Sequence, residues 1–113
     1  MHELSIAQNM IEEIERQAPL NGFTRVLRVT LEIGSLSHVE VDAMKFCFDS
    51  AVMDTIAEGA SLQIQKVPAI ALCKQCNSEQ TIEARYDCCS SCGEFGLEVL
   101  SGDKVSIKAL EVS

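Results

Sequence analysis

The chain carries two C-x-x-C stretches, Cys73-Lys74-Gln75-Cys76 and Cys89-Ser90-Ser91-Cys92, with residues 77–88 between them. We call them the first and second knuckle. Each knuckle presents two sulfurs on one tight turn, so the pair can place four thiolates around one tetrahedral ion. Zn²⁺ is the ion most often held in this way, at about 2.3 Å from each sulfur. Because four thiolates leave no position for water, we expect a structural site without catalytic activity.

Other roles for the cysteines fit the pattern less well. A single C-x-x-C would suit a thioredoxin-like redox pair or a disulfide, but two in such close succession favour a metal. A rubredoxin-like iron centre is the alternative to zinc. Cys88 would break the two-residue spacing to Cys92, so we interpret it as a spare thiol. Cys47 lies in an apolar run and is predicted to be a small core residue.

Length and composition limit the class of protein. A chain of 113 residues can bury one modest core, and its hydrophobic content of 47% is ordinary for a globular domain. The N-terminal residues have neither the basic nor the long apolar segment of a secretory signal, and no apolar run is long enough for a membrane span. Six cysteines in a chain of this kind indicate a reducing, cytoplasmic setting and metal binding.

The charge of the chain excludes further classes. The net charge is −8, and its 9 Lys and Arg residues are scattered, which argues against a zinc ribbon that reads DNA or RNA. With 2 histidines, the chain offers no convincing Ser-His-Asp set for a hydrolase. We therefore expect weak nucleic-acid binding at most and no hydrolase of this kind.

Hydrophobic periodicity predicts an α+β fold: two helices packed on a small three-stranded mixed sheet, with an inserted zinc-ribbon-like module that holds its ion through four cysteines. The last strand is expected to rejoin the first sheet, so the domains are 1–68 plus 101–113, and the insert 69–100. Pro19 and the Asn21-Gly22 turn are expected to end the first helix, and Ser37 to Glu40 to form a capping box for the second. The predicted helices are 4–17 and 38–53, and the predicted strands are 24–33, 61–67, 80–83, 97–100 and 105–112.

The N-terminus, Met1-His2-Glu3, suggests a second metal site. A bulky residue at position 2 hinders removal of Met1, so its amine, with an ordinary pKa of about 7.7–8.0, should persist. That amine, the amide nitrogen and the imidazole of His2 can chelate one ion, and deprotonated amides favour Ni²⁺ or Cu²⁺. Glu3 could add a backbone nitrogen or its carboxylate. His38 competes as a ligand, but it fits a surface residue at a helix start better.

The sequence resembles the HypA/HybF nickel-insertion proteins over its whole length. The resemblance is carried by the N-terminal Met1-His2-Glu3-Leu4-Ser5, by Leu31-Glu32-Ile33-Gly34-Ser35-Leu36-Ser37 with Val39-Glu40, and by the paired knuckles. Many members have Cys-Pro where this chain has Cys89-Ser90, a change that removes no metal ligand.

The resemblance implies a metallochaperone, not an enzyme, that serves maturation of nickel–iron hydrogenase. Nickel is then expected at His2, with Glu3 tuning its binding and Glu40 near the site, and zinc at the four knuckle cysteines. The implied partners are a HypB-type GTPase and the precursor of the hydrogenase large subunit. Some members also assist urease. A homo-oligomer is compatible with the family, whose members self-associate in more than one form.

Overall fold

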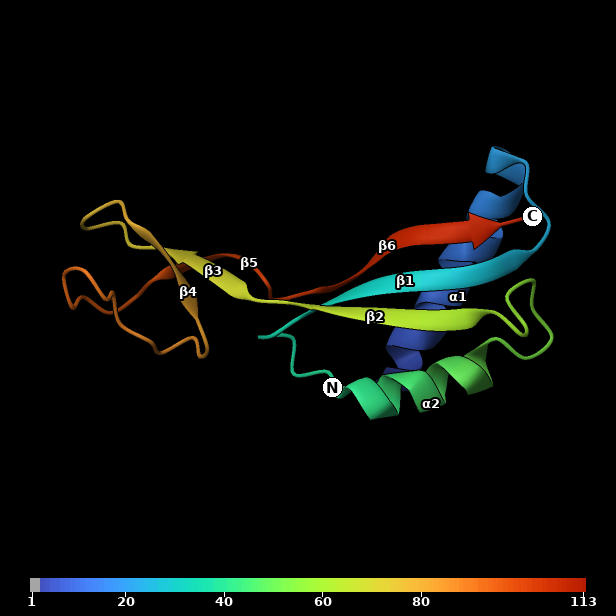
Figure 1. The fold of residues 1–113 in the computed structure, drawn as a ribbon, viewed down its shortest axis with the longest axis horizontal. Helices are drawn as coiled ribbons and strands as arrows, with labels where there is room; N and C mark the ends of the chain where they lie inside the picture. Colours follow the sequence, from blue (N-terminus) through green and yellow to red (C-terminus); the bar gives the residue numbers. More distant parts are fainter. Residues whose placement is uncertain (1–2) are drawn as a thin grey trace. The chain divides into compact units, whose positions relative to one another are not determined.

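The computed structural model describes residues 3–113, which fall into two compact units. The described part of unit 1 is residues 3–31, 39–65 and 106–113, and unit 2 is residues 32–38 and 66–105. No helix in the described range has the length and apolarity of a membrane span. The elements, drawn in Figure 1, are α1 (Glu3–Asn21), β1 (Val26–Gly34), α2 (Val41–Ala51), β2 (Ser61–Val67), β3 (Ala69–Leu72), β4 (Glu79–Ile82), β5 (Glu98–Ser101) and β6 (Val105–Val112).

The first sheet has the order β2-β1-β6 and is mixed. The amide of Val26 bonds to Ile56 O and that of Ser35 to Val67 O, so β1 and β2 run in the same direction. Arg25 and Ser113 exchange hydrogen bonds at the other edge, where β6 runs antiparallel to β1. The last strand therefore joins the first sheet and the fold is α+β, as the sequence pattern predicted.

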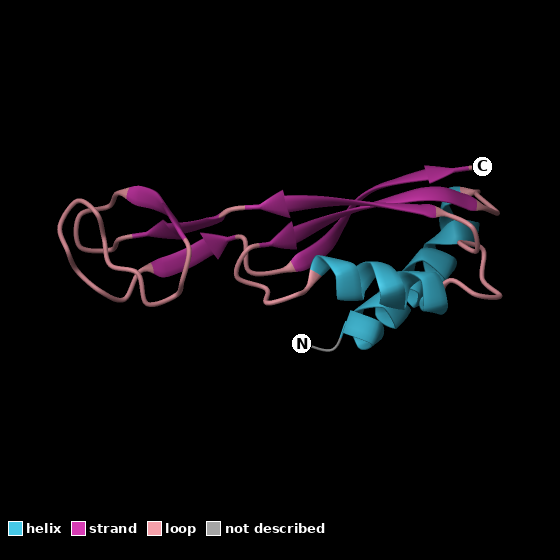
Figure 2. Ribbon diagram, turned by 60° about the horizontal axis from the view of Figure 1, so that its bottom comes forward, coloured by secondary structure: helices cyan, strands magenta, loops and turns pink. Residues whose placement is uncertain are grey.

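The two helices pack against each other in unit 1 and lie on one face of its sheet (Figure 2). α1 contributes side chains spaced three and four residues apart, which is the period that places them on one helical face. Burying this face against α2 and β1 supplies the main core of the unit. Its largest fully buried side chains are Ile14, Val26, Val29, Leu31, Met44 and Phe48.

α1 does not stop before Pro19, contrary to the prediction, but continues to Asn21. Proline in the last turn removes only one intrahelical hydrogen bond, because little helix follows it. The helix ends at Gly22, whose φ of +73° lies in the left-handed region, and the amide of Phe23 then bonds to Ala18 O at 3.1 Å. A glycine in this conformation is the usual C-terminal stop signal.

The predicted capping box before α2 is wrong. The Ser37 hydroxyl donates to Gly34 O at 2.7 Å within a turn, so it does not cap the helix. His38 follows with φ of 60°, and α2 begins only at Val41, after Glu40, which forms no side-chain cap. The local turn competes successfully for the serine hydroxyl, a known alternative for this residue type.

Unit 2 contains a second sheet, of order β4-β3-β5 and antiparallel throughout, that the sequence pattern did not predict as a sheet. Its central strand, β3, was missed because Pro68 was expected to end the extended segment and only four residues, two of them alanine, follow before the first knuckle. The sheet encloses a modest apolar cluster consisting of Leu36, Ala69, Ala71 and Ile82, with Leu97 and Val99 packed against it.

Two glycines allow backbones to cross closely at one end of unit 2. A Cβ on Gly34 would meet Gly102 C at 2.2 Å, and a Cβ on Gly102 would meet Ala69 Cα at 2.4 Å. The amide of Leu36 bonds to Gly102 O at 2.9 Å at the same point. Only glycine fits such an approach, and Gly102 also has φ of +87°.

Candidate metal centre

The structure brings the four knuckle cysteines together in unit 2. The sulfurs of Cys73, Cys76, Cys89 and Cys92 all lie within 4.8 Å of one another. The Cys73 and Cys92 sulfurs are 3.5 Å apart, and those of Cys76 and Cys89 are 3.6 Å apart. Four sulfurs at about 2.3 Å from a central zinc would be about 3.8 Å apart, so the spacing fits a tetrahedral ion. We call this group the four-cysteine cluster.

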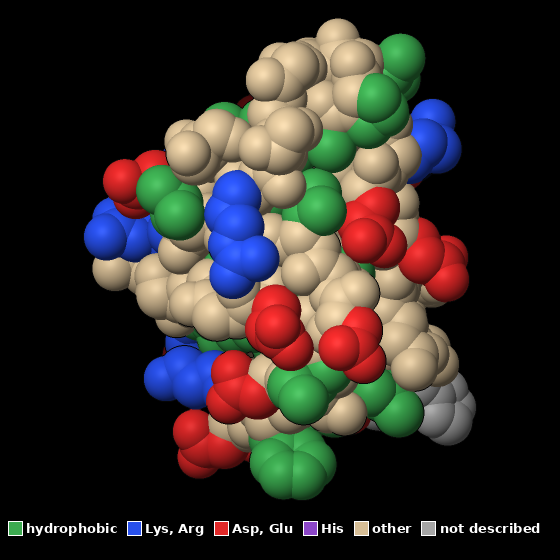
Figure 3. Space-filling model, turned by 90° about the vertical axis from the view of Figure 1, so that its right-hand side faces the viewer, with side chains coloured by type: hydrophobic (Ala, Val, Ile, Leu, Met, Phe, Trp, Pro, Cys, Tyr) green, Lys and Arg blue, Asp and Glu red, His purple; other side chains and the backbone are tan. Residues whose placement is uncertain are grey.

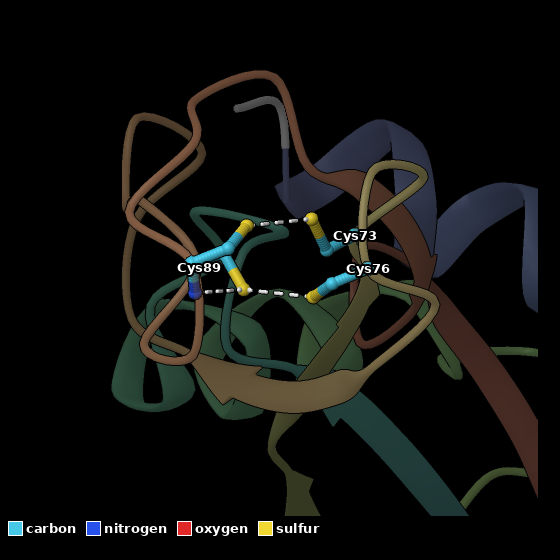
Figure 4. A group of neighbouring side chains, drawn as sticks. Cys73, Cys76 and Cys89 are labelled. Atoms are coloured by element: carbon cyan, nitrogen blue, oxygen red, sulfur yellow. Dashed lines mark hydrogen bonds between the residues drawn. The ribbon is translucent and has the colours of Figure 1, made fainter.

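Figure 4 shows Cys73, Cys76 and Cys89 with their sulfurs turned toward one another. Cys73 and Cys89 are buried, whereas Cys76 and Cys92 are exposed, so each knuckle gives the cluster one inner and one outer sulfur. All six cysteines of the chain are free thiols. The S···S distances of 3.5 and 3.6 Å are much longer than a disulfide bond of about 2.05 Å.

The two knuckles repeat the same backbone pattern. The amides of Asn77 and Gly93 bond to the carbonyls of Cys73 and Cys89, four residues earlier in each case, at 2.7 and 2.8 Å. Asn77 and Gly93 both have positive φ, at 61° and 77°. Each first cysteine donates its own amide to the carbonyl five residues later. This closed turn explains why the two-residue spacing places both sulfurs of a knuckle on one side.

Ser78 lies beside sulfurs of both knuckles. Its hydroxyl is 3.0 Å from Cys76 Sγ and 3.5 Å from Cys89 Sγ. Cys89 Sγ also accepts hydrogen bonds from the amides of Ser91 and Cys92, at 3.4 and 3.5 Å. Sequence reasoning did not identify Ser78, because no spacing rule relates a serine two residues after a knuckle to a sulfur of the other one.

Gln80 fastens the second knuckle to β4. Its Nε2 donates to Cys88 O at 3.0 Å, and its Oε1 accepts from the Ser90 amide at 2.8 Å and from the Ser90 hydroxyl at 3.1 Å. These bonds satisfy both ends of the glutamine amide. The chain therefore positions the second knuckle with protein contacts as well as through any bound ion.

Hydrogen bonds and burial give the thiols of the cluster different pKa values. The Ser78 hydroxyl, with the Cys92 amide, lowers the pKa of Cys89 to about 5. Ser78 also lowers the pKa of Cys76. The Glu94 amide acts to lower the pKa of Cys92, but desolvation and the neighbouring thiols outweigh it and raise that pKa to about 12. A thiolate ready for metal and a thiol that must lose its proton thus lie in one cluster.

The remaining sequence candidates lie elsewhere. Cys88 is exposed and stands outside the four-cysteine cluster, and Cys47 is half-buried on α2. His38 is exposed in the turn before α2. Met1 and His2, the main candidates for nickel, lie outside the described residues. Glu3 begins α1, and its Oε2 accepts a hydrogen bond from the Glu40 amide at 3.2 Å.

Surface charge is mixed where unit 1 is viewed from its end. On the face in Figure 3, red carboxylates and blue Lys and Arg side chains are interspersed, without a continuous basic area on that face. Unit 1 also carries an exposed ion pair, in which Arg28 and Glu111 lie 3.7 Å apart. A strand of nucleic acid needs a continuous basic track, so this face offers little for it.

The comparisons with known proteins agree on one family. The family model described as "Hydrogenase/urease nickel incorporation, metallochaperone, hypA" matches residues 1–112. The hydrogenase maturation factors HypA of Azotobacter chroococcum mcd 1 and Geobacter metallireducens are 45% and 46% identical to this chain over 112 residues, covering 99% of each chain. The solution structure of the Ni metallochaperone HypA from Helicobacter pylori aligns with a TM-score of 0.77 at 23% identity, covering 99% of this chain and 97% of that one. That structural likeness confirms the fold.

Proposed function

The chain belongs to the HypA family of hydrogenase/urease nickel-incorporation metallochaperones, and on that premise we propose how it divides two metals between two sites. One Ni²⁺ binds at the N-terminus as cargo, and one Zn²⁺ stays in the four-cysteine cluster as a structural ion. The family consists of metallochaperones rather than enzymes, so the bound metals serve delivery and shape. The observation that carries this division is the difference between the two donor sets.

The four-cysteine cluster suits an ion that stays. Four sulfurs within 4.8 Å of one another surround a tetrahedral ion completely, which leaves no position for an incoming ligand. Zinc bound there would hold the knuckles together, in a unit whose own buried cluster is small. This site therefore supports the shape of unit 2.

The N-terminal donors suit an ion that leaves. An amine, an imidazole and backbone nitrogens can be replaced by a partner's ligands one at a time, and protons compete for the first two. We propose Met1 and His2 as ligands through the amine, the amide and the imidazole. Glu3 would contribute its backbone nitrogen or its carboxylate, whose Oε2 accepts a hydrogen bond from the Glu40 amide.

The recipients follow from the family and from nickel chemistry. We propose that the chain works in the cytoplasm with a HypB-type GTPase and docks on the precursor of the hydrogenase large subunit. Nickel–iron hydrogenase is the client that the family description and the names of the relatives support, and urease is a second client in the family description.

A transfer experiment tests the delivery function. The nickel-loaded chain is incubated with metal-free large-subunit precursor and the GTPase, the proteins are separated, and nickel is measured in each. We expect nickel to appear in the precursor and to fall in the chain, whereas the His2→Ala variant should deliver none above background. Equal delivery by free nickel, by the parent chain and by His2→Ala would contradict the proposal.

A further inference from the structure

We propose that Ser78 is a positioning residue of the four-cysteine cluster, whose hydroxyl donates to the bound thiolates and slows loss of the ion. The inference rests on the proposed zinc site and adds an outer residue to its four ligands. Two observations carry it: the hydroxyl is within hydrogen-bond distance of a sulfur from each knuckle, and the backbone of Ser78 is fixed by the first knuckle.

The geometry places one hydroxyl between two ligands. Ser78 Oγ is 3.0 Å from Cys76 Sγ and 3.5 Å from Cys89 Sγ, so its proton can serve either sulfur, with the shorter contact favouring Cys76. The Cys73 amide donates to Ser78 O at 2.9 Å, which holds the serine at the end of the first knuckle. The backbone of Ser78 is therefore held in place, and rotation about a single side-chain torsion brings its hydroxyl to the sulfurs.

Metal binding gives the hydroxyl a defined direction of donation. Thiols can donate or accept, but a thiolate bound to a cation can only accept. Once the ion is bound, Ser78 must be the donor. A hydrogen bond to a thiolate withdraws charge from sulfur, making it a poorer nucleophile and a poorer base, and outer-sphere partners of this kind commonly alter metal affinity 10–100-fold. The thiolate is then less readily protonated or attacked by electrophiles. Because a chelator captures the ion only after a thiolate has left it and taken up a proton, transfer of the ion to a chelator should also be slower.

The two bridged sulfurs should respond unequally to loss of the hydroxyl. Cys89 Sγ keeps its bonds from the amides of Ser91 and Cys92, which no side-chain substitution removes. Cys76 is also the more exposed of the two, so water and chelators reach it more easily. The Cys76–metal bond should therefore be the first to open in a variant that lacks the Ser78 hydroxyl.

The test uses the full chain loaded with zinc. Zinc release to an excess of a coloured chelator is timed for the parent, Ser78→Ala, Ser78→Thr and Ser101→Ala. Ser101 is the matched control, because it is an exposed serine of the same unit that lies on β5, outside both knuckles. We expect release about 10-fold faster for Ser78→Ala. Ser78→Thr, which keeps the hydroxyl, and Ser101→Ala should stay close to the parent.

Cobalt substitution supplies a readout that a change of shape alone would not produce. Without the hydroxyl, the sulfur electrons are less stabilised, so the thiolate-to-cobalt charge-transfer band of Ser78→Ala should move to longer wavelength, while Ser78→Thr should match the parent. Equal release rates and bands for Ser78→Ala and the parent would overturn the inference, as would equal acceleration by Ser101→Ala. A parent chain that holds no zinc would instead count against the proposed function.

Discussion

At the second knuckle, Cys88 and Cys89 are neighbours in sequence but have different surroundings. Cys89 is buried among the sulfurs of the cluster, and Cys88 is exposed outside it. We predict that Cys89→Ala lowers zinc content well below the parent value of about one per chain, because three thiolates remain. Cys88→Ala should keep full zinc content. Zinc content is measured by metal analysis after desalting. Zinc loss from Cys88→Ala but not from Cys89→Ala would show that Cys88, and not Cys89, is the ligand.

The acidities of the same sulfurs predict how zinc binding depends on pH. The pKa of Cys89 is lowered to about 5, so at pH 7 this group is already a thiolate in the metal-free chain. The lowered pKa stabilises the folded metal-free chain, and this stabilisation is complete above the ordinary thiol pKa of about 8.5 and disappears as the pH falls through about 5. Because Cys89 has no proton to lose at pH 7, zinc binding at that pH should release fewer than four protons.

Proton release can be measured by titrating zinc into a weakly buffered solution of the metal-free chain with a pH indicator. Cys88→Ala is the control and should release the same number as the parent. Release of four protons per zinc at pH 7 would mean that Cys89 is protonated in the metal-free chain, against the hydrogen bonds seen around it.

For single residues, the sequence predicts those positions whose spacing follows from their role as metal ligands. The two-residue spacing identified the four cysteines that meet and set Cys88 apart, because both knuckles share that interval and form the same turn. Ser78 and Gln80 could not be predicted in the same way. Their contacts reach residues 10 or 11 positions away and exist only because β4 brings the second knuckle beside them.

At the level of secondary structure, the close approach of Gly34 and Gly102 in unit 2 offers a direct test of packing. Gly102→Ala would introduce a Cβ that meets Ala69 Cα at 2.4 Å and would also force alanine to φ of +87°. Gly22→Ala imposes a comparable φ of +73° with nothing within 4 Å, so it isolates the conformational cost of about 1–2 kcal/mol. We predict that Gly102→Ala destabilises its unit by more than this amount.

Amide hydrogen exchange measures the two effects separately. Gly102→Ala should speed exchange of the protected β3 amides by more than about 10-fold, since 1.4 kcal/mol corresponds to a factor of ten when exchange reports local opening. Gly22→Ala should act on the end of α1 and leave β3 unchanged. Unaltered β3 exchange in Gly102→Ala would show that the backbone can separate there at little cost.

Element boundaries show why the sequence prediction succeeded only in part. Periodicity gave both helices and the strands of the first sheet, because each buries one face. It placed the end of α1 too early at Pro19 and the start of α2 too early at the Ser37 turn, since it could not tell which local hydrogen bonds would form. β3 was missed because a four-residue segment that follows a proline and contains two alanines carries a weak strand signal.

In the molecule as a whole, each unit has its own core. We therefore predict that the two units respond separately to the removal of zinc. Unit 1 buries large side chains such as Phe48 and Ile14, whereas the unit 2 cluster includes Ala69 and Ala71. Chelating zinc should abolish exchange protection in the knuckles and weaken it in β3–β5, because metal binding there is coupled to folding. Helical circular dichroism should change little, and a cooperative loss of the helices on chelation would contradict this independence.

A single titration can decide whether nickel and zinc occupy different donor sets. The untagged parent and His2→Ala are titrated with Ni²⁺ by calorimetry, and total nickel and zinc are then measured in each. We expect about one nickel and one zinc per parent chain, nickel binding that weakens below the free imidazole pKa of about 6.5, and a His2→Ala variant that loses nickel but keeps zinc. Nickel binding by His2→Ala as tight as that of the parent would contradict this expectation.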